Sequence, residues 1–141
     1  MTTFLFGQTP LGLGIPAYNF NQGGPRVLIL GGVHGDEIEG VIAAQGLFKA
    51  FVESFPYQLN LTLVPAFNLE GVIERTRTNS RGVDLNRNLP TKDWSPEIKT
   101  PRYHPGPSAN SEPENQALAK FIETENPQFI LSLHSWHPVL N

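Results

Sequence analysis

The sequence contains no cysteine among its 141 residues. Disulfide bonds and thiolate metal ligands are therefore excluded, and any bound metal must be held by histidine, aspartate or glutamate. Charged residues are also few, at 16% of the chain, and the net charge is -3. This composition lacks the basic surface that is typical of nucleic-acid-binding proteins, so we expect no nucleic-acid partner.

Long hydrophobic runs are missing as well. No stretch approaches the ~20 apolar residues that a membrane-spanning helix requires. The first residues, 1–8, lack the basic and apolar regions of a signal peptide. We therefore expect a cytoplasmic protein with no membrane partner. With 39% hydrophobic residues, a chain of this length can form one hydrophobic core, and we expect residues 1–141 to be a single domain.

The hydrophobic pattern alternates between strand-like and helix-like segments. In chain order it predicts an antiparallel strand pair at 4–20, a strand at 27–30, a helix at 38–55, a strand at 59–65, a helix that begins after residue 111, and a strand at 129–133. This order is typical of an α/β fold. We expect a mixed, largely parallel central sheet with flanking helices.

Several details of these elements can be tested directly. The continuous apolar strands 27–30 and 129–133 predict burial on both faces. Ser111 and Glu114 have the spacing of a capping box at a helix start. Residues 68–111 show little periodicity, which in a compact domain indicates a functional or disordered segment. The first helix is expected to bury one face, made of Ile38, Val41, Ile42, Phe48, Val52 and Phe55.

The sequence GGVHGDE at residues 31–37 places His34 and Glu37 three residues apart, where a strand passes into a helix. His134 follows the strand at 129–133, and ligands of open α/β sheets bind at the carboxyl ends of the strands. Each feature alone has a plain structural explanation. Together, in a chain without cysteine, they favour a zinc site of two histidines, one glutamate and a water. His104 and His137, which lie beside prolines, are expected to be surface residues.

Four arginines occur between residues 75 and 87, and Asp84 is the single acid among them. A solvated basic loop is the simplest explanation of the charge. The run also contains asparagines and lies between apolar strands, which favours a site for carboxylates, because a guanidinium can bind a carboxylate through two parallel hydrogen bonds.

Five segments together resemble the zinc metallocarboxypeptidase family. They are HGDE at 34–37, RTN at 77–79, GVDLNRNLP at 82–90, SEPE at 111–114 and LHSW at 133–136. Their order and spacing are most similar to the bacterial murein tripeptide amidases, which cleave the γ-D-glutamyl–diaminopimelate bond of cell-wall peptides in the cytoplasm. The resemblance implies a zinc-carboxypeptidase-like fold, one Zn²⁺ per chain, and hydrolysis of an amide bond next to a free carboxylate during cell-wall recycling.

The resemblance also implies a role for each matching residue of the metal centre. His34, Glu37 and His134 would hold the Zn²⁺. Asp84 would accept a hydrogen bond from the second ring nitrogen of His34 and so fix the tautomer of that ligand.

Substrate contacts are implied in the same way. Asn86 and Arg87 would bind the terminal carboxylate of the peptide. Arg77 would polarise the scissile carbonyl and stabilise the oxyanion. Arg75 is the alternative if the register of that motif is shifted.

The general base of the family is a glutamate on a later strand. The glutamates of this chain do not occupy its place in the motif order: Glu39, Glu70, Glu74, Glu112 and Glu114. We therefore expect the N-terminal part of the family's domain, with its C-terminal part missing. An apolar sheet edge beside Leu131 and Leu133 would then be open to a second copy or to the missing half. The resemblance further implies a cis peptide bond between residues 135 and 136.

Two other functional hypotheses remain open. A desuccinylase- or aspartoacylase-like zinc amidohydrolase shares the HGxE and DLNR motifs and the histidine at a strand end. The SEPE and GVDLNRNLP motifs are closer to the peptidases. A catalytically incomplete zinc-binding fragment is the other alternative, because the expected base is not in the chain.

Overall fold

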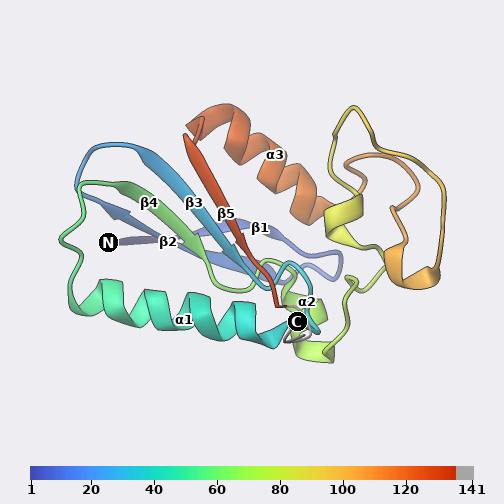
Figure 1. Ribbon diagram of the computed structural model, residues 1–141, viewed down its shortest axis with the longest axis horizontal. Coiled ribbons are helices and arrows are strands. Elements are labelled where there is room, and N and C mark those ends of the chain that lie inside the picture. Colours follow the sequence, from blue (N-terminus) through green and yellow to red (C-terminus); the bar gives the residue numbers. More distant parts are fainter. Residues whose placement is uncertain (136–141) are drawn as a thin grey trace, which may run out of the picture.

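Five strands form one mixed sheet in the computed structural model, which describes residues 1–135 (Figure 1). The strands lie in the order β1-β2-β4-β3-β5. β3 runs parallel to both β4 and β5, whereas β2 runs antiparallel to β1 and β4. The mixed α/β sheet is therefore confirmed. The strand bounds are β1 Thr2–Gln8, β2 Gly14–Asn21, β3 Arg26–Gly31, β4 Asn60–Val64 and β5 Phe129–Leu133.

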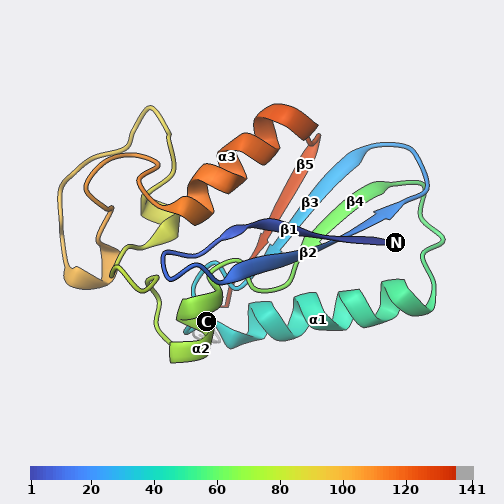
Figure 2. The ribbon, with the colours of Figure 1, turned by 180° about the vertical axis from the view of Figure 1, so that it is seen from behind.

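Helices cover both faces of this sheet (Figures 1 and 2). Helix α1 (Ile38–Glu53) lies along one face and α3 (Pro113–Glu125) along the other, while α2 (Leu69–Glu74) is a short helix near the start of α1. The long segment that follows α2 extends past the end of the sheet and returns to α3 (Figure 1). Within residues 1–135, no helix has the length and hydropathy needed to cross a membrane.

Strand β3 is buried on both faces, as its apolar run predicts. Val27 and Ile29 belong to the core cluster on the α1 side, together with Ala44. Leu28 and Leu30 belong to the cluster on the α3 side. Complete burial of such a side chain contributes about 1.5–3 kcal/mol. β3 contributes to both halves of the core, as do β2 and β4.

Strand β5 differs from its predicted burial on both faces. Phe129, Ile130 and Leu131 are 58%, 46% and 46% exposed. The cause is its place in the sheet: within the part of the chain that the structure describes, β5 pairs with β3 on one side and is the edge strand on the other. The prediction of an apolar edge beside Leu131 is confirmed, and the prediction of a buried strand is wrong.

The buried face of α1 is also shifted from the predicted one. Ile38, Ile42 and Val52 are exposed. The predictions for Val41, Phe48 and Phe55 are confirmed. The buried face is centred on these residues, and its aromatic members contact Phe20 and Tyr18 of β2. Its members are Val41, Ala44, Phe48 and Phe51, continued beyond the helix by Phe55.

The predicted capping box is wrong. The N-cap of α3 is Glu112, one residue after Ser111, and no side chain among residues 1–135 caps the helix start. The Ser111 hydroxyl instead donates a hydrogen bond to Glu112 (2.7 Å), and the Glu114 carboxylate accepts one from Asn79. Both glutamates are thus used to hold the preceding loop rather than to cap the helix.

Candidate metal centre

Three glycines shape the turn that carries His34 and Glu37 at the end of β3. Gly32 has φ +62°, a conformation that favours glycine. A side chain at Gly35 would overlap the backbone of Gly71 in α2. The GGVHG sequence therefore lets α2 pack directly against the turn, with His34 inside it (2% exposed) and Glu37 at the N-cap of α1.

The structure brings the three predicted metal ligands together. His34 Nδ1 lies 2.9 Å from Glu37 Oε1, and His134 Nδ1 lies 2.8 Å from Glu37 Oε2. One ligand atom from each residue falls within 4.8 Å of the other two. The side chains come from the carboxyl ends of β3 and β5 and the start of α1, which is the edge of the sheet where α/β proteins bind ligands.

This donor set fits a zinc ion. Two imidazole nitrogens and one carboxylate oxygen are the protein ligands of many catalytic zinc sites, which leave a fourth position for water. His134 is exposed while His34 is buried, so the group is open on the His134 side. The carboxylate of Glu37 stays ionised: burial acts to raise its pKa, but the hydrogen bond with His134 and the charges of His34 and His134 hold the pKa below its usual value.

Behind the ligand group, Asp84 and Arg77 form a network. His34 Nε2 lies 3.0 Å from Asp84 Oδ1, and Asp84 is fully buried. Arg77 donates through Nε to Asp84 Oδ2 (2.9 Å) and through Nη1 to Glu37 Oε1 (3.1 Å). Burial acts to raise the pKa of Asp84, but the hydrogen bonds with His34 and Arg77 lower it below its ordinary value. An ionised Asp84 orients His34 so that Nδ1 faces Glu37.

Of the two candidate arginines, the structure places Arg77 at the centre. Arg75 is the C-cap of α2, with φ 55°, and its side chain is exposed. The role predicted for Arg77, polarisation of a substrate carbonyl, stays a prediction. Its guanidinium is bound by two carboxylates of the centre and is thereby held in place.

Asn86 and Arg87 lie beside the metal centre rather than among its ligands, and the backbone amide of Asn86 donates to Asp84 Oδ1 (3.0 Å). Both are exposed and line a cavity of about 490 Å³ together with Trp94, Lys99 and Tyr103. His34, Glu37 and His134 are not among the residues that line this cavity. The connection runs through Tyr103, whose ring centroid lies 5.1 Å from the Arg77 guanidinium and 5.7 Å from that of Arg87.

The long segment between α2 and α3 is built on buried asparagines. Asn79 Oδ1 accepts hydrogen bonds from the backbone amides of Arg81 and Val83, both 3.1 Å, and its amide nitrogen donates to Glu112 (2.9 Å). Asn88 donates to the carbonyl of Pro105 (2.8 Å). The asparagines that accompany the arginines therefore order the segment internally. Its predicted role in binding carboxylates stays a prediction.

Sequence reasoning missed α2 and the segment Thr100–Pro105. The six-residue helix α2 is too short for a clear period, and its cap is the side chain of Asn68, which accepts from Gly71 (3.0 Å). Arg102 forms an ion pair with Asp36 (2.8 Å), the residue just before Glu37. Asp36, the acid inside the HGDE motif, is the feature of the sequence from which a basic partner could have been predicted.

The other two histidines, His104 and His137, are predicted to lie on the surface rather than to bind the metal. His104 is half-buried rather than on the surface, and its Nδ1 accepts from the backbone amide of Gly106 (2.9 Å), so it does not take the place of His134. His137 and the predicted cis bond after residue 135 lie outside the described residues.

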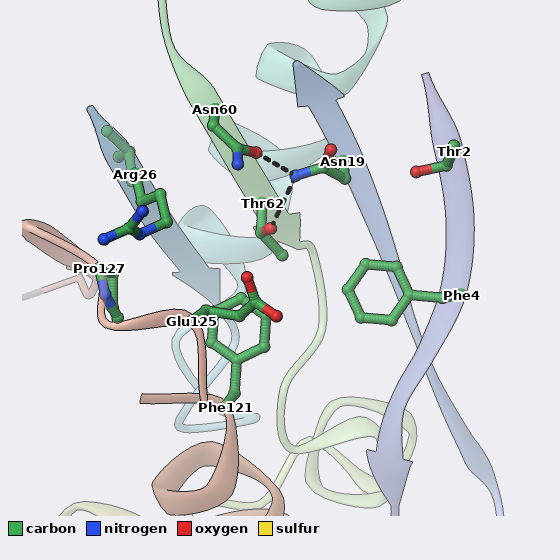
Figure 3. A pocket seen from close by; sticks show the side chains of 10 residues that line it. Thr2, Phe4, Asn19, Arg26, Asn60, Thr62, Phe121, Glu125 and Pro127 are labelled. Carbon is green, nitrogen blue, oxygen red and sulfur yellow. Dashed lines mark hydrogen bonds between the residues drawn. The ribbon is translucent and has the colours of Figure 1, made fainter. Parts of the chain in front are cut away.

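A second pocket, of about 280 Å³, lies at the opposite end of the parallel strands (Figure 3). It is lined by the first residues of β3 and β4, Arg26 and Asn60, and by Phe121 of α3. Asn19 bridges its floor with hydrogen bonds to Asn60 (2.8 Å) and Thr62 (3.1 Å). These polar groups form hydrogen bonds with one another, so this part of the sheet face is polar and can be exposed to solvent.

A mixed α/β sheet with a His–Glu–His group at the carboxyl ends of its strands has the ligand set of a catalytic zinc centre. The sequence profile of the zinc carboxypeptidase family matches residues 2–141, and the chain belongs to that family.

Individual relatives give the same picture. The murein peptide amidase A of Vibrio campbellii is 30% identical over 149 residues, covering 93% of this chain and 58% of the relative. The crystal structure of a murein-tripeptide amidase from Escherichia coli O157 superposes with a TM-score of 0.79 at 26% identity, covering 94% of this chain and 61% of that one. A succinylglutamate desuccinylase/aspartoacylase from Rhodobacter sphaeroides gives a TM-score of 0.61 at 26% identity, with 88% and 34% covered. The chain thus spans about half the length of the curated relatives it matches.

Proposed function

We propose that this chain is the zinc-binding N-terminal part of an amidase that hydrolyses the γ-D-glutamyl–diaminopimelate bond of murein peptides, next to a free carboxylate. The observation that carries the proposal is the convergence of His34, Glu37 and His134 at the sheet edge, with Asp84 against the second ring nitrogen of His34. A protein with this activity would act in the cytoplasm during cell-wall recycling, as the resemblance implies.

In this proposal, one Zn²⁺ supplies Lewis acidity and lowers the pKa of a bound water toward ~7. The residues of the chain prepare the site. Asp84 fixes the ring of His34 so that Nδ1 is the ligand atom, and Arg77 keeps the carboxylates of Asp84 and Glu37 in place. Arg77 also brings a positive charge close to the metal ligands, where it favours an oxyanion.

Asn86 and Arg87 would bind the substrate's terminal carboxylate. Both side chains are exposed on a cavity large enough for part of a small peptide. Because Arg87 is exposed, its loss should cost less binding free energy than the loss of a buried charge pair.

The general base is not assigned to a residue of this chain. Glu70, Glu112 and Glu114 are buried, and their hydrogen bonds are made to Leu11, Ser111 and Asn79 rather than to the metal group. The resemblance places the base on a later strand of the family's domain. In the proposal the base therefore comes from polypeptide that this chain does not contain.

The proposal predicts chelator-sensitive amidase activity in the longer protein. The protein that contains this chain and its continuation should release diaminopimelate from L-Ala-γ-D-Glu-diaminopimelate, because zinc and the base would then be present together. A chelator should abolish the activity, and added Zn²⁺ should restore it. Chromatographic analysis of the products measures this. Activity that survives complete metal removal would refute the zinc mechanism.

A desuccinylase-like activity is the second candidate, since a protein of that kind has the same general fold. The closer superposition on the murein-tripeptide amidase favours the peptide substrate. N-succinylglutamate offered in the same assay separates the two, because a desuccinylase would release succinate from it.

The exposed edge of β5 supports a further part of the proposal. An unpaired strand edge is a template for pairing with another strand. We expect the isolated 141-residue chain to pair with a second copy at this edge. In the longer protein, the remaining part of the domain would cover it. Sedimentation velocity should then show association that increases with concentration.

Leu131→Lys should weaken this association, because a lysine on an edge strand opposes pairing. Leu11→Lys is the matched control, since Leu11 is exposed in the turn between β1 and β2, away from β5. A chain that remains monomeric at all concentrations, or that responds equally to both variants, would contradict pairing through β5.

A further inference from the structure

The segment Thr100–Pro105 is fastened to the metal centre on both sides of Tyr103. Before it, Arg102 Nη2 forms an ion pair with Asp36 Oδ2 (2.8 Å) in the turn that carries the ligands. After it, the His104 carbonyl accepts a hydrogen bond from the backbone amide of Asp84 (2.9 Å). The backbone position of Tyr103 is therefore set by the same turn and the same aspartate that organise the candidate metal ligands.

The ring of Tyr103 contacts two guanidinium groups with different surroundings. Arg77, at 5.1 Å from the ring centroid, is already bound to Asp84 and Glu37. Arg87, at 5.7 Å, forms no ion pair with another residue in the range 1–135, and its side chain is exposed. A guanidinium is attracted electrostatically to the face of an aromatic ring. For Arg87, this is the contact that restrains an otherwise free side chain.

We propose that Tyr103 is a positioning residue, which holds the Arg87 guanidinium at a set place relative to Arg77 and the metal ligands. The inference rests on the proposed function, in which Arg87 binds the terminal carboxylate of the peptide. Tyr103 leaves the hydrogen-bond donors of Arg87 free while its ring limits the orientations of the guanidinium. Less side-chain freedom is then lost when the carboxylate binds, so the complex is more stable. The peptide is also held at a fixed distance from the reacting centre.

The substitutions Tyr103→Ala and Tyr103→Phe test this role. Phenylalanine keeps the aromatic face, so it is the conservative control. The probe is L-Ala-γ-D-Glu-diaminopimelate, compared with the same peptide carrying a terminal amide, and the readout is calorimetric binding to the zinc-loaded protein. Tyr103→Ala should weaken binding of the free acid by about 2- to 5-fold, the range expected for one guanidinium–aromatic contact at an exposed site. The terminal amide should bind equally well to Tyr103→Ala and to Tyr103→Phe. For the free acid, the affinity of Tyr103→Phe should stay within about 2-fold of that of the unaltered protein.

A second measurement separates this inference from the proposed function. The Nε–Hε group of Arg87 can be followed by ¹⁵N relaxation without any ligand. Its order parameter should fall in Tyr103→Ala and be retained in Tyr103→Phe. Unchanged Arg87 mobility in Tyr103→Ala, or equal weakening of the acid and the amide, would overturn the positioning role. If the order parameter behaves as expected but the unaltered protein does not distinguish acid from amide, Tyr103 still holds Arg87, and the carboxylate-binding function is the part that fails.

Discussion

Replacing His34 with alanine should lower the zinc affinity of the chain by more than about 100-fold. Its Nδ1 is one of three converging donor atoms, and it is the buried member of the set. Changes to groups that merely orient a zinc ligand already cost roughly 10- to 100-fold in affinity, so the loss of a ligand should cost more. Competition with a chromophoric chelator measures the dissociation constant directly, without reference to catalysis.

Two further variants are reference points for the loss of zinc affinity. Asp84→Asn keeps the shape of the side chain that contacts His34 Nε2 but removes its charge, and should fall in the range of roughly 10- to 100-fold. His104→Ala removes a histidine that lies outside the ligand group and should leave the zinc affinity unchanged. If His104→Ala weakens binding as much as His34→Ala does, the assignment of the metal centre is wrong.

The parts of the site that the sequence predicts are those determined by local backbone geometry. His34 and Glu37 lie within one turn, and the glycines around them indicate its tight shape. His134 could be placed with them because strands of a parallel sheet end at the same edge, and β3 and β5 are direct neighbours. Asp84 came instead through the family resemblance, since its contact with His34 spans 50 residues and follows from no local pattern.

The remaining features depend on contacts that hydrophobic periodicity does not encode. Ser111 and Glu114 have the spacing of a capping box. The Glu114 carboxylate instead accepts a hydrogen bond from Asn79, which lies in a distant loop. The apolar run of β5 is typical of a buried strand, but burial also depends on a neighbouring strand, and β5 lies at the edge. Tyr103 is an aromatic residue in a proline-rich stretch, and its two arginine contacts appear only when the chain is folded.

Glu114 gives the second prediction with a large effect, because it is a fully buried carboxyl group beside another one. Asn79 Nδ2 donates to Glu112 at 2.9 Å and approaches both oxygens of Glu114 at 3.4 Å, so a single amide serves two acids. Burial, together with the charges of Glu112 and Glu70, raises the pKa of Glu114 to about 7 from an ordinary value of 4.5. In the folded chain the proton is therefore held more tightly than in the unfolded chain.

The consequence for stability follows from proton linkage. The contribution of Glu114 is most favourable below about pH 4.5, decreases as the pH rises toward about 7, and is constant above that. The difference between the two pKa values corresponds to about 3 kcal/mol of unfolding free energy. Glu114→Gln should recover most of this amount at pH 8, because glutamine has the shape of the protonated acid and carries no charge. At pH 4.5 the variant and the unaltered chain should be nearly equal.

Urea denaturation at both pH values measures the effect. Glu123→Gln is the matched control, since Glu123 is exposed on the same helix and its replacement should leave the pH dependence intact. An unfolding free energy that falls equally between pH 4.5 and 8 in Glu114→Gln and in the unaltered chain would show that Glu114 is not the titrating group.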